Sequence, residues 1–250
     1  MVKIYKVKDK SEKHYVDKGD MFNLPMRLLI VGKSHLSGKT NLLTNLLLQD
    51  DSDLYKKEFK GEDIYIFSGS IDTDKKIQTI IEEKEVGNVF SEFDDDVLDA
   101  ILDNIQEEYM EKPFHSLIIL DDMSFGGNLK KKTYGALGRL FSNGRHIGAS
   151  VILTSQKYTD ILSSARENCS GCILFKCTDR QLDTISEEHN FLENRKDFKK
   201  MFRTVTKEPH SFLSISYSNP PDRMYMNNEF KPIGSCGKVV GDGCNCKPKS

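Results

Sequence analysis

Short runs of apolar residues alternate along this chain with stretches in which apolar residues recur every three or four positions. The short runs predict buried strands, because a strand covered on both faces carries apolar side chains throughout. They lie at residues 27–31, 63–67, 117–120, 149–154, 171–175 and 211–217. The recurring pattern predicts amphipathic helices. It occurs at residues 38–48, 73–84, 97–109, 134–141, 180–188 and 194–202. Strands in alternation with helices predict an α/β protein with a mostly parallel sheet, covered by helices on both faces.

Both ends of the chain differ in composition from this central region. Residues 1–25 are rich in lysine, and Pro25 marks the entry to the first strand. From Asn219 onward, proline, asparagine, glycine and lysine dominate, which is typical of mobile chain. We therefore expect a basic N-terminal arm over residues 1–25, an α/β domain over residues 26–217 and a flexible C-terminal tail over residues 218–250.

The most informative segment follows the first predicted strand. That strand ends at Gly32, and a short polar loop then leads to Gly38-Lys39-Thr40 at the start of a leucine-rich helix. This order is typical of the phosphate-binding loop of nucleoside triphosphatases, because backbone N–H groups at a helix N-terminus bind anions. We expect Lys39 to reach the β- and γ-phosphates of ATP and the Thr40 hydroxyl to bind Mg²⁺. The predicted ATP-binding residues are Gly32, Lys33, Ser34, Ser37, Gly38, Lys39, Thr40 and Asn41.

The spacing within this loop departs from the usual pattern. Glycine normally stands five positions before the second glycine, but here that position is Lys33 and the nearest glycine is Gly32. Either the loop is one residue longer than usual, or Lys33 replaces the glycine. The alternative is an ordinary strand–loop–helix connection, which the surrounding strand and helix make a rare coincidence.

Two later strands end in polar residues that suit ATP hydrolysis. The run 116–120 ends in Asp121-Asp122, as in a Walker B strand, and we expect Asp121 to hold Mg²⁺ together with Thr40. Asp122 stands where many ATPases keep a carboxylate that orients or deprotonates the attacking water. The strand at 149–154 leads to Gln156, which we expect to face the γ-phosphate; a capped strand end is the alternative.

These motifs, in this order, resemble those of the FtsK/HerA class of DNA-pumping ATPases. The resemblance rests on the phosphate-binding loop, Asp121-Asp122, the strand that ends at Gln156 and the sequence Ala-Arg-Glu-Asn at 165–168. The small size and the stretch 151–158 are similar to the genome-packaging ATPases of large eukaryotic DNA viruses, poxvirus-like viruses and virophages. The resemblance covers roughly residues 26–217. It implies a RecA-like P-loop NTPase fold of the additional-strand type.

The resemblance also implies an assembly and partners. It implies a ring, expected to be a hexamer, that threads double-stranded DNA into a preformed capsid and docks on capsid or portal-like viral proteins. In such rings an arginine from the neighbouring subunit stabilises the transferring phosphoryl group. The candidates are Arg145 and Arg166, and a solvated arginine at a helix end is the alternative for each. The implied location is the virus assembly site in the host cytoplasm, or the virion.

A basic loop after Asp122 is the candidate DNA contact. It has two glycines at 126–127 and then Lys130, Lys131 and Lys132. Lysines bind DNA phosphates without reading sequence, which suits a motor that moves along any DNA. The alternative is a solvated surface run.

Composition limits these interpretations without deciding among them. The chain has 250 residues and a formal net charge of −2, so DNA binding would have to use a local basic patch. No apolar stretch is long enough to span a membrane, and the N-terminus has no signal-peptide pattern. We therefore expect an intracellular, reducing setting in which cysteines are thiols or metal ligands.

Three groups of residues raise the question of a bound metal. Cys236, Cys244 and Cys246 lie in the tail and could hold zinc, although a fourth ligand is missing. Cys169, Cys172 and Cys177 favour a role as small buried residues. The acidic triplet at 94–96 favours a helix N-terminus over a metal site.

Two other classes of function stay open from sequence. A small nucleoside or nucleotide kinase would need an arginine-rich lid, whereas the arginines here are scattered. A GTPase is disfavoured because no Asn-Lys-x-Asp motif is present. A nucleotide-regulated DNA- or capsid-binding module with little turnover is supported by the departure at Lys33 and by Asp122, at a position where glutamate is more usual.

Overall fold

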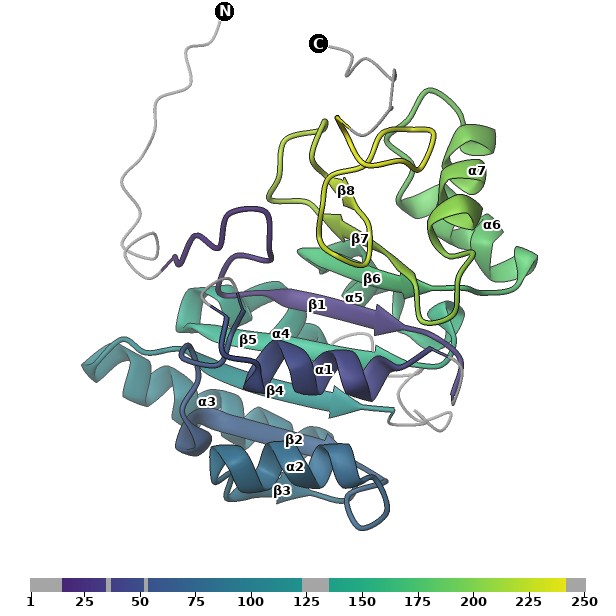
Figure 1. Ribbon diagram of the computed structural model, residues 1–250. Helices are drawn as coiled ribbons and strands as arrows, with labels where there is room; N and C mark the ends of the chain where they lie inside the picture. The colour runs from purple at the N-terminus through teal and green to yellow at the C-terminus, as the bar shows by residue number, and fades with distance from the viewer. Residues whose placement is uncertain (1–14, 35–36, 52–53, 123–134, 242–250) are drawn as a thin grey trace, which may run out of the picture.

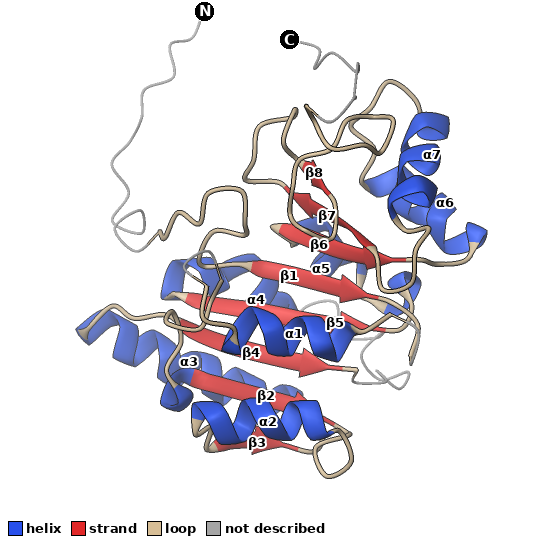
Figure 2. Cartoon of the chain, in the orientation of Figure 1, coloured by secondary structure: helices blue, strands red, loops and turns tan. Residues whose placement is uncertain are grey.

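The computed structural model describes residues 15–34, 37–51, 54–122 and 135–241 (Figure 1). These residues form an eight-stranded sheet with helices on both faces (Figure 2). The strands are β1 (Arg27–Val31), β2 (Ile64–Ser68), β3 (Asn88–Phe90), β4 (Ser116–Asp121), β5 (Ala149–Ser155), β6 (Gly171–Phe175), β7 (Phe212–Ser216) and β8 (Tyr225–Met226). The α-helices are α1 (Lys39–Leu48), α2 (Lys75–Lys84), α3 (Asp95–Glu111), α4 (Ala136–Asn143), α5 (Ser163–Asn168), α6 (Asp179–Glu188) and α7 (Arg195–Val205). Short 3₁₀ helices are η2 (Gly61–Asp63), η4 (Gly144–Ile147) and η5 (Tyr158–Asp160).

The apolar pattern predicted the longer elements correctly. All six predicted strands are present, with ends that differ from the prediction by no more than about one residue. The pattern missed β3, β8 and α5, because elements this short contain too few residues to show a period. Asp94 caps α3 as predicted: its carboxylate accepts hydrogen bonds from the backbone N–H groups of Asp96 at 2.8 Å and Val97 at 3.2 Å.

The strand order places three strand ends side by side. The sheet runs β3-β2-β4-β5-β1-β6-β7-β8, with parallel pairing from β3 to β6 and antiparallel pairing of β6 with β7 and of β7 with β8. β5 therefore separates β1 from β4, which confirms the predicted additional-strand topology. Because these three strands are parallel, the residues that follow β1, β4 and β5 meet at one end of the sheet, where the strands have their carboxyl ends.

Side chains from β1 pack into two separate cores, one on each face of the sheet. Leu28 and Ile30 belong to the core that contains α1 and α2, whereas Leu29 and Val31 belong to the core that α3 to α7 share. Figure 1 shows α1 and α2 in front of the sheet and α3 and α4 behind it. Both faces are buried, so the strand is apolar at consecutive positions and fixes the loop that follows it.

The domain includes more of both chain ends than composition predicted. Met21, Phe22 and Leu24 are buried, although they lie in the predicted N-terminal arm. Residues 218–241 do not form the predicted flexible tail: β8 pairs with β7, and Met224 and Ile233 are buried beside it. Average polarity hides such segments, because a few apolar residues are enough to hold a short strand on a sheet edge.

Cys169 and Cys172 are buried core residues, which the sequence favoured. Cys172 is fully buried, and its Sγ lies 3.5 Å from the Sγ of Cys169 as a free thiol. Cys236 is half-buried, and Cys244 and Cys246 lie outside the described residues. Within the described ranges no group of three or more His, Cys, Asp or Glu side chains is arranged to hold a metal ion. None of the helices in those ranges has the length and apolar character needed to cross a bilayer.

A buried histidine connects α6 to the strands at the far edge. The side chain of His189 is 2% exposed, and its Nε2 lies 2.5 Å from the hydroxyl of Tyr158. Its Nδ1 contacts the hydroxyl of Tyr217, and its carbonyl accepts a hydrogen bond from Tyr225. Burial, assisted by the positive charge of Arg166, lowers the pKa of His189 from 6.5 to about 4.

We expect His189 to make the fold sensitive to acid. Between pH 6.5 and pH 4 the unfolded chain binds a proton at this position and the folded chain does not, so stability is lost as the pH falls through this window. The contribution is up to about 3 kcal/mol. Urea unfolding at several pH values should show a shallower pH dependence for His189→Gln than for the wild type. The exposed His146→Gln is the control, and equal slopes for all three proteins would contradict the assignment.

Candidate functional site

The loop between β1 and α1 begins with a glycine that has no room for a side chain. A Cβ on Gly32 would lie 2.5 Å from the Cβ of Ser37 and 2.9 Å from the Cβ of Phe175. The Gly32 N–H donates to the carbonyl of Ser155 at 3.0 Å, which ties the loop to the end of β5. Lys33, in contrast, is exposed. The lack of room at Gly32 favours the alternative in which the loop is one residue longer and Gly32 is its first glycine.

The second glycine and the lysine lie at the start of α1. Gly38 has φ +83°, a left-handed conformation that favours glycine, and it precedes the first residue of α1. Lys39 is buried, and its Nζ donates to the carbonyl of Gly32 at 2.7 Å. Burial lowers the pKa of Lys39, whereas the negative charges of Asp122 and Asp121 raise it. The ammonium group therefore lies across the loop, within the electrostatic influence of both carboxylates.

Hydroxyl groups from the two neighbouring strands hold the Asp121 carboxylate. Thr154 donates to Oδ1 at 2.8 Å from β5, and Ser68 donates to Oδ2 at 3.1 Å from β2. Asp121 is 3% exposed, and burial raises its pKa, although these two hydrogen bonds oppose the shift. Sequence reasoning missed Ser68 and Thr154. Their only signal was a polar residue at the end of an apolar strand.

Asp122 and Gln156, which the sequence singled out as polar residues after two strands, are in contact. The Gln156 Nε2 donates to the Asp122 Oδ2 at 2.6 Å, between the residues that follow β5 and β4. Asp122 has φ +43°, an uncommon conformation for a residue with a side chain, and its N–H donates to the hydroxyl of Thr154 at 2.9 Å. Thr154 thus positions both carboxylates, one by donating and one by accepting a hydrogen bond.

The oxygen atoms of Asp121 and Thr40 are of the kind that a hard divalent cation such as Mg²⁺ prefers. Asp121 offers a buried carboxylate whose oxygens already accept hydrogen bonds, and the Thr40 side chain lies on the first turn of α1. Mg²⁺ at a phosphate site takes one or two protein oxygens and completes its shell with phosphate and water. A single carboxylate and a hydroxyl therefore suffice here. The remaining predicted ATP-binding residues, Ser34 and Asn41, are exposed on the loop and on α1.

The two candidate arginines lie in different environments. Arg166 on α5 pairs with Glu188 and lies over the ring of Tyr158, with 5.1 Å from its guanidinium carbon to the ring centroid. Arg145 is exposed on η4, which precedes β5. It therefore lies at the amino ends of the strands, opposite the phosphate-binding loop at their carboxyl ends. The predicted DNA contacts Lys130, Lys131 and Lys132 lie outside the described residues.

Comparison with known proteins places this arrangement in a family. Residues 12–216 match the family described as Poxvirus A32 protein. The chain belongs to this family. The match confirms the resemblance predicted from the motifs, and it extends further toward the N-terminus than residue 26. No curated protein matches the sequence.

Solved structures share the fold at low sequence identity. The genome packaging NTPase B204 from Sulfolobus turreted icosahedral virus 2, in complex with AMP, matches with a TM-score of 0.58 and 16% identity, over 82% of this chain and 96% of that chain. The same protein in complex with ATP-gammaS gives a TM-score of 0.55 and 16% identity, over 76% and 91% of the two chains. B204, the DNA-packaging ATPase from Sulfolobus turreted icosahedral virus, gives 0.55 and 17%, over 82% and 97%.

The close approach at Gly32 can be tested by adding a methyl group. We expect Gly32→Ala to lower the free energy of unfolding by about 1–3 kcal/mol, because the new Cβ overlaps Ser37 and Phe175. In Gly87→Ala the new Cβ meets nothing within 4 Å, so a change of no more than about 0.5 kcal/mol is expected. Urea unfolding measures both values. A Gly32→Ala protein as stable as Gly87→Ala would show that the loop does not pack as described.

Proposed function

We propose that the protein is an ATP-driven translocase of double-stranded DNA that packages a viral genome into a preformed capsid. The observation that carries the proposal is the meeting of Lys39, Asp121, Asp122 and Gln156 at the carboxyl ends of three adjacent parallel strands. Membership of the A32 family supports it. The fold is shared with B204, which is described as a genome packaging NTPase and occurs in complexes with AMP and ATP-gammaS.

Each residue of this candidate site has a chemical role in the proposed hydrolysis. Backbone N–H groups of the loop and the ammonium of Lys39 bind the β- and γ-phosphates. Thr40 and Asp121 hold Mg²⁺, which neutralises charge on the phosphate oxygens when it is bound. Asp122 orients the attacking water and accepts its proton as the bond from the γ-phosphorus to the bridging oxygen breaks. Gln156 fixes Asp122 through the 2.6 Å hydrogen bond.

A ring assembly would supply what one subunit lacks. Within the described residues, neither candidate arginine is placed to reach the subunit's own phosphate site. Arg166 is held by Glu188, and Arg145 lies at the amino ends of the strands. Head-to-tail subunit contacts that close into a ring bring different surfaces together. We assign Arg145 as the trans-acting residue of a homo-oligomeric ring, which we propose is a hexamer, and we assign Arg166 a structural role.

The proposed DNA contact and the proposed partners come from sequence and family. Lys130, Lys131 and Lys132 bind DNA phosphates in this proposal, which lets a chain of net charge −2 hold DNA locally. Capsid or portal-like viral proteins dock the ring, at the assembly site in the host cytoplasm or in the virion. The contact of Gln156 with Asp122 favours a hydrolase over a nucleoside kinase, because it equips the site to hold water rather than a second nucleotide.

We expect ATP hydrolysis that long double-stranded DNA stimulates. Lys39→Ala should abolish hydrolysis, because the ammonium that neutralises the transferring phosphoryl group is removed. Thr44→Ala is a matched control: the Thr44 hydroxyl bonds within α1, to the carbonyl of Thr40, so hydrolysis should stay near the wild-type rate. Phosphate release with and without DNA measures both. Hydrolysis that depends on Lys39 but is indifferent to DNA would contradict a motor.

The trans role of Arg145 can be tested by mixing subunits. We expect Arg145→Ala to fold normally and to lose DNA-stimulated hydrolysis, whereas Arg166→Ala should lower the melting temperature, because Glu188 loses its ion pair. Mixing Arg145→Ala with Lys39→Ala should restore part of the activity. In mixed rings, a Lys39→Ala subunit supplies Arg145 to an intact phosphate site next to it. No restoration, or full activity of Arg145→Ala alone, would contradict the assignment.

A further inference from the structure

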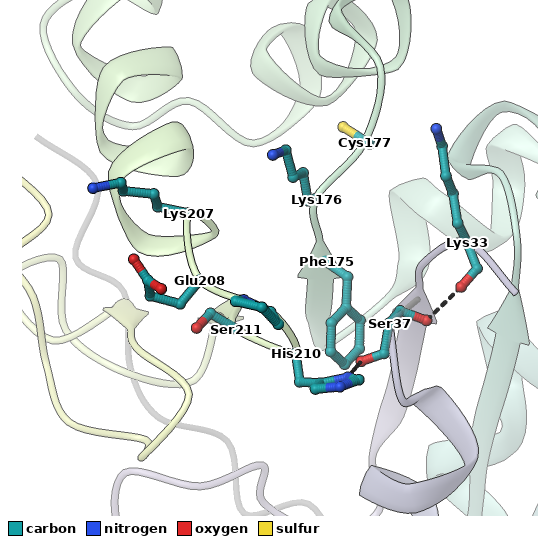
Figure 3. Close-up of a pocket in the computed structure, with 10 residues that line it drawn as sticks. Lys33, Ser37, Phe175, Lys176, Cys177, Lys207, Glu208, His210 and Ser211 are labelled. Carbon is teal, nitrogen blue, oxygen red and sulfur yellow. Dashed lines mark hydrogen bonds between the residues drawn. The ribbon is translucent and has the colours of Figure 1, made fainter. Parts of the chain in front are cut away.

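A cavity of about 380 Å³ adjoins the phosphate-binding loop on the side that faces β6 and β7 (Figure 3). Lys33 and Ser37 line it from the loop, Phe175 lines it from the end of β6, and residues 207–211 line it from the connection between α7 and β7. The volume lies within the range of roughly 300–1,000 Å³ that is typical of small-molecule sites. The cavity is therefore large enough for a ligand that continues from the loop.

His210 forms the wall of the cavity next to the loop. Its Nδ1 lies 3.4 Å from the carbonyl of Ser37, and a Cβ on Gly38 would come within 3.3 Å of the same nitrogen. Its backbone has φ +63°, in the left-handed region that histidine tolerates better than most residues. This conformation turns the imidazole toward the loop, as Figure 3 shows. Sequence reasoning gave no signal for His210, because it lies far from the loop in the chain.

The rest of the cavity combines an apolar surface with positive charge. The ring of Phe175 packs edge-on against Phe212 at a centroid distance of 5.3 Å, which fixes its position. The side chains of Lys33, Lys176 and Lys207 add positive charge to the lining. A flat ring therefore has aromatic neighbours inside the cavity, and a polyanion attached to that ring is attracted to the lysines and the loop.

We propose that this cavity binds the base and ribose of the nucleoside triphosphate, with His210 as the residue that contacts the base. The inference rests on the proposed function, since it assumes that the loop binds the phosphates. Helix N-termini favour anion binding, and the cavity adjoins the loop that precedes α1 through Lys33 and Ser37. A nucleotide held there would extend its base toward His210 and Phe175.

The lining also predicts weak discrimination among bases. Asparagine and glutamine, the side chains that pair bidentately with adenine, are absent from it, and Glu208 is its one carboxylate. In Figure 3 that carboxylate points away from His210. Contact with a ring face is tolerant of base identity, because every base has one. We therefore expect ATP and GTP to bind with affinities that differ by less than about tenfold.

The test separates base binding from phosphate binding. Competition against radiolabelled ATP-gammaS, on the full chain with Mg²⁺, compares ATP, GTP and inorganic tripolyphosphate. His210→Asn keeps a residue that tolerates the left-handed backbone but removes the aromatic ring, and His210→Phe keeps a ring. We expect His210→Asn to weaken ATP and GTP about tenfold each and tripolyphosphate less than twofold, while His210→Phe stays within about threefold of the wild type.

Different results would overturn different parts of the argument. Unchanged binding of ATP by His210→Asn, or equal weakening of ATP and tripolyphosphate, would remove His210 from the base site, provided that thermal melts show both variants folded. A preference for ATP of more than about a hundredfold would overturn the weak discrimination. A wild-type protein that binds neither nucleotide would overturn the proposed function itself. DNA-indifferent hydrolysis with the expected His210 effects would overturn the motor alone.

Discussion

The buried carboxylate of Asp121 constrains the site more than any other group. Removing a charged carboxylate from water is costly, and the cost falls only when hydrogen-bond donors or a cation meet its oxygens. Here the donors are the hydroxyls of Ser68 and Thr154, which come from the strands on either side of β4. The order β2-β4-β5 is therefore a requirement of the chemistry as well as of packing. A change of register in either neighbour would leave one carboxylate oxygen without its donor.

The same arrangement explains why the charged groups of the site, Lys39, Asp121 and Asp122, influence one another electrostatically. Thr154 donates to Asp121 and accepts from the backbone of Asp122, so one hydroxyl sets the positions of both carboxylates. Burial lowers the pKa of Lys39, and the negative charges of Asp122 and Asp121 oppose this shift. A lysine and two carboxylates near one loop form a site whose charges partly balance before a nucleotide binds. Such preorganised charge is the main source of catalysis in phosphoryl transfer.

A single subunit is chemically incomplete under the proposed mechanism. The loop, the carboxylates and Gln156 lie at the carboxyl ends of the central strands, while exposed Arg145 lies at their amino ends. Arg166, which is closer in sequence to Gln156, is paired with Glu188 and packs on Tyr158, next to buried His189. These contacts hold the half-buried Arg166 side chain against Tyr158 and Glu188. Completion of the proposed site by a neighbouring copy would couple hydrolysis to assembly, as a ring motor requires.

The sequence by itself determined the local elements, since apolar period, glycines and capping residues act over a few neighbouring positions. It predicted β1, the loop with Gly38-Lys39-Thr40, the cap at Asp94 and the polar residues Asp122 and Gln156 after two strands, and its motif order led to the correct family. Only the tertiary structure decided that Gly32 has no room for a side chain, because one of the excluding contacts comes from Phe175 on another strand. The same holds for Ser68, Thr154 and His210, whose roles depend on atoms far away in the chain, and for residues 218–241, whose few apolar side chains find partners only on the folded sheet edge.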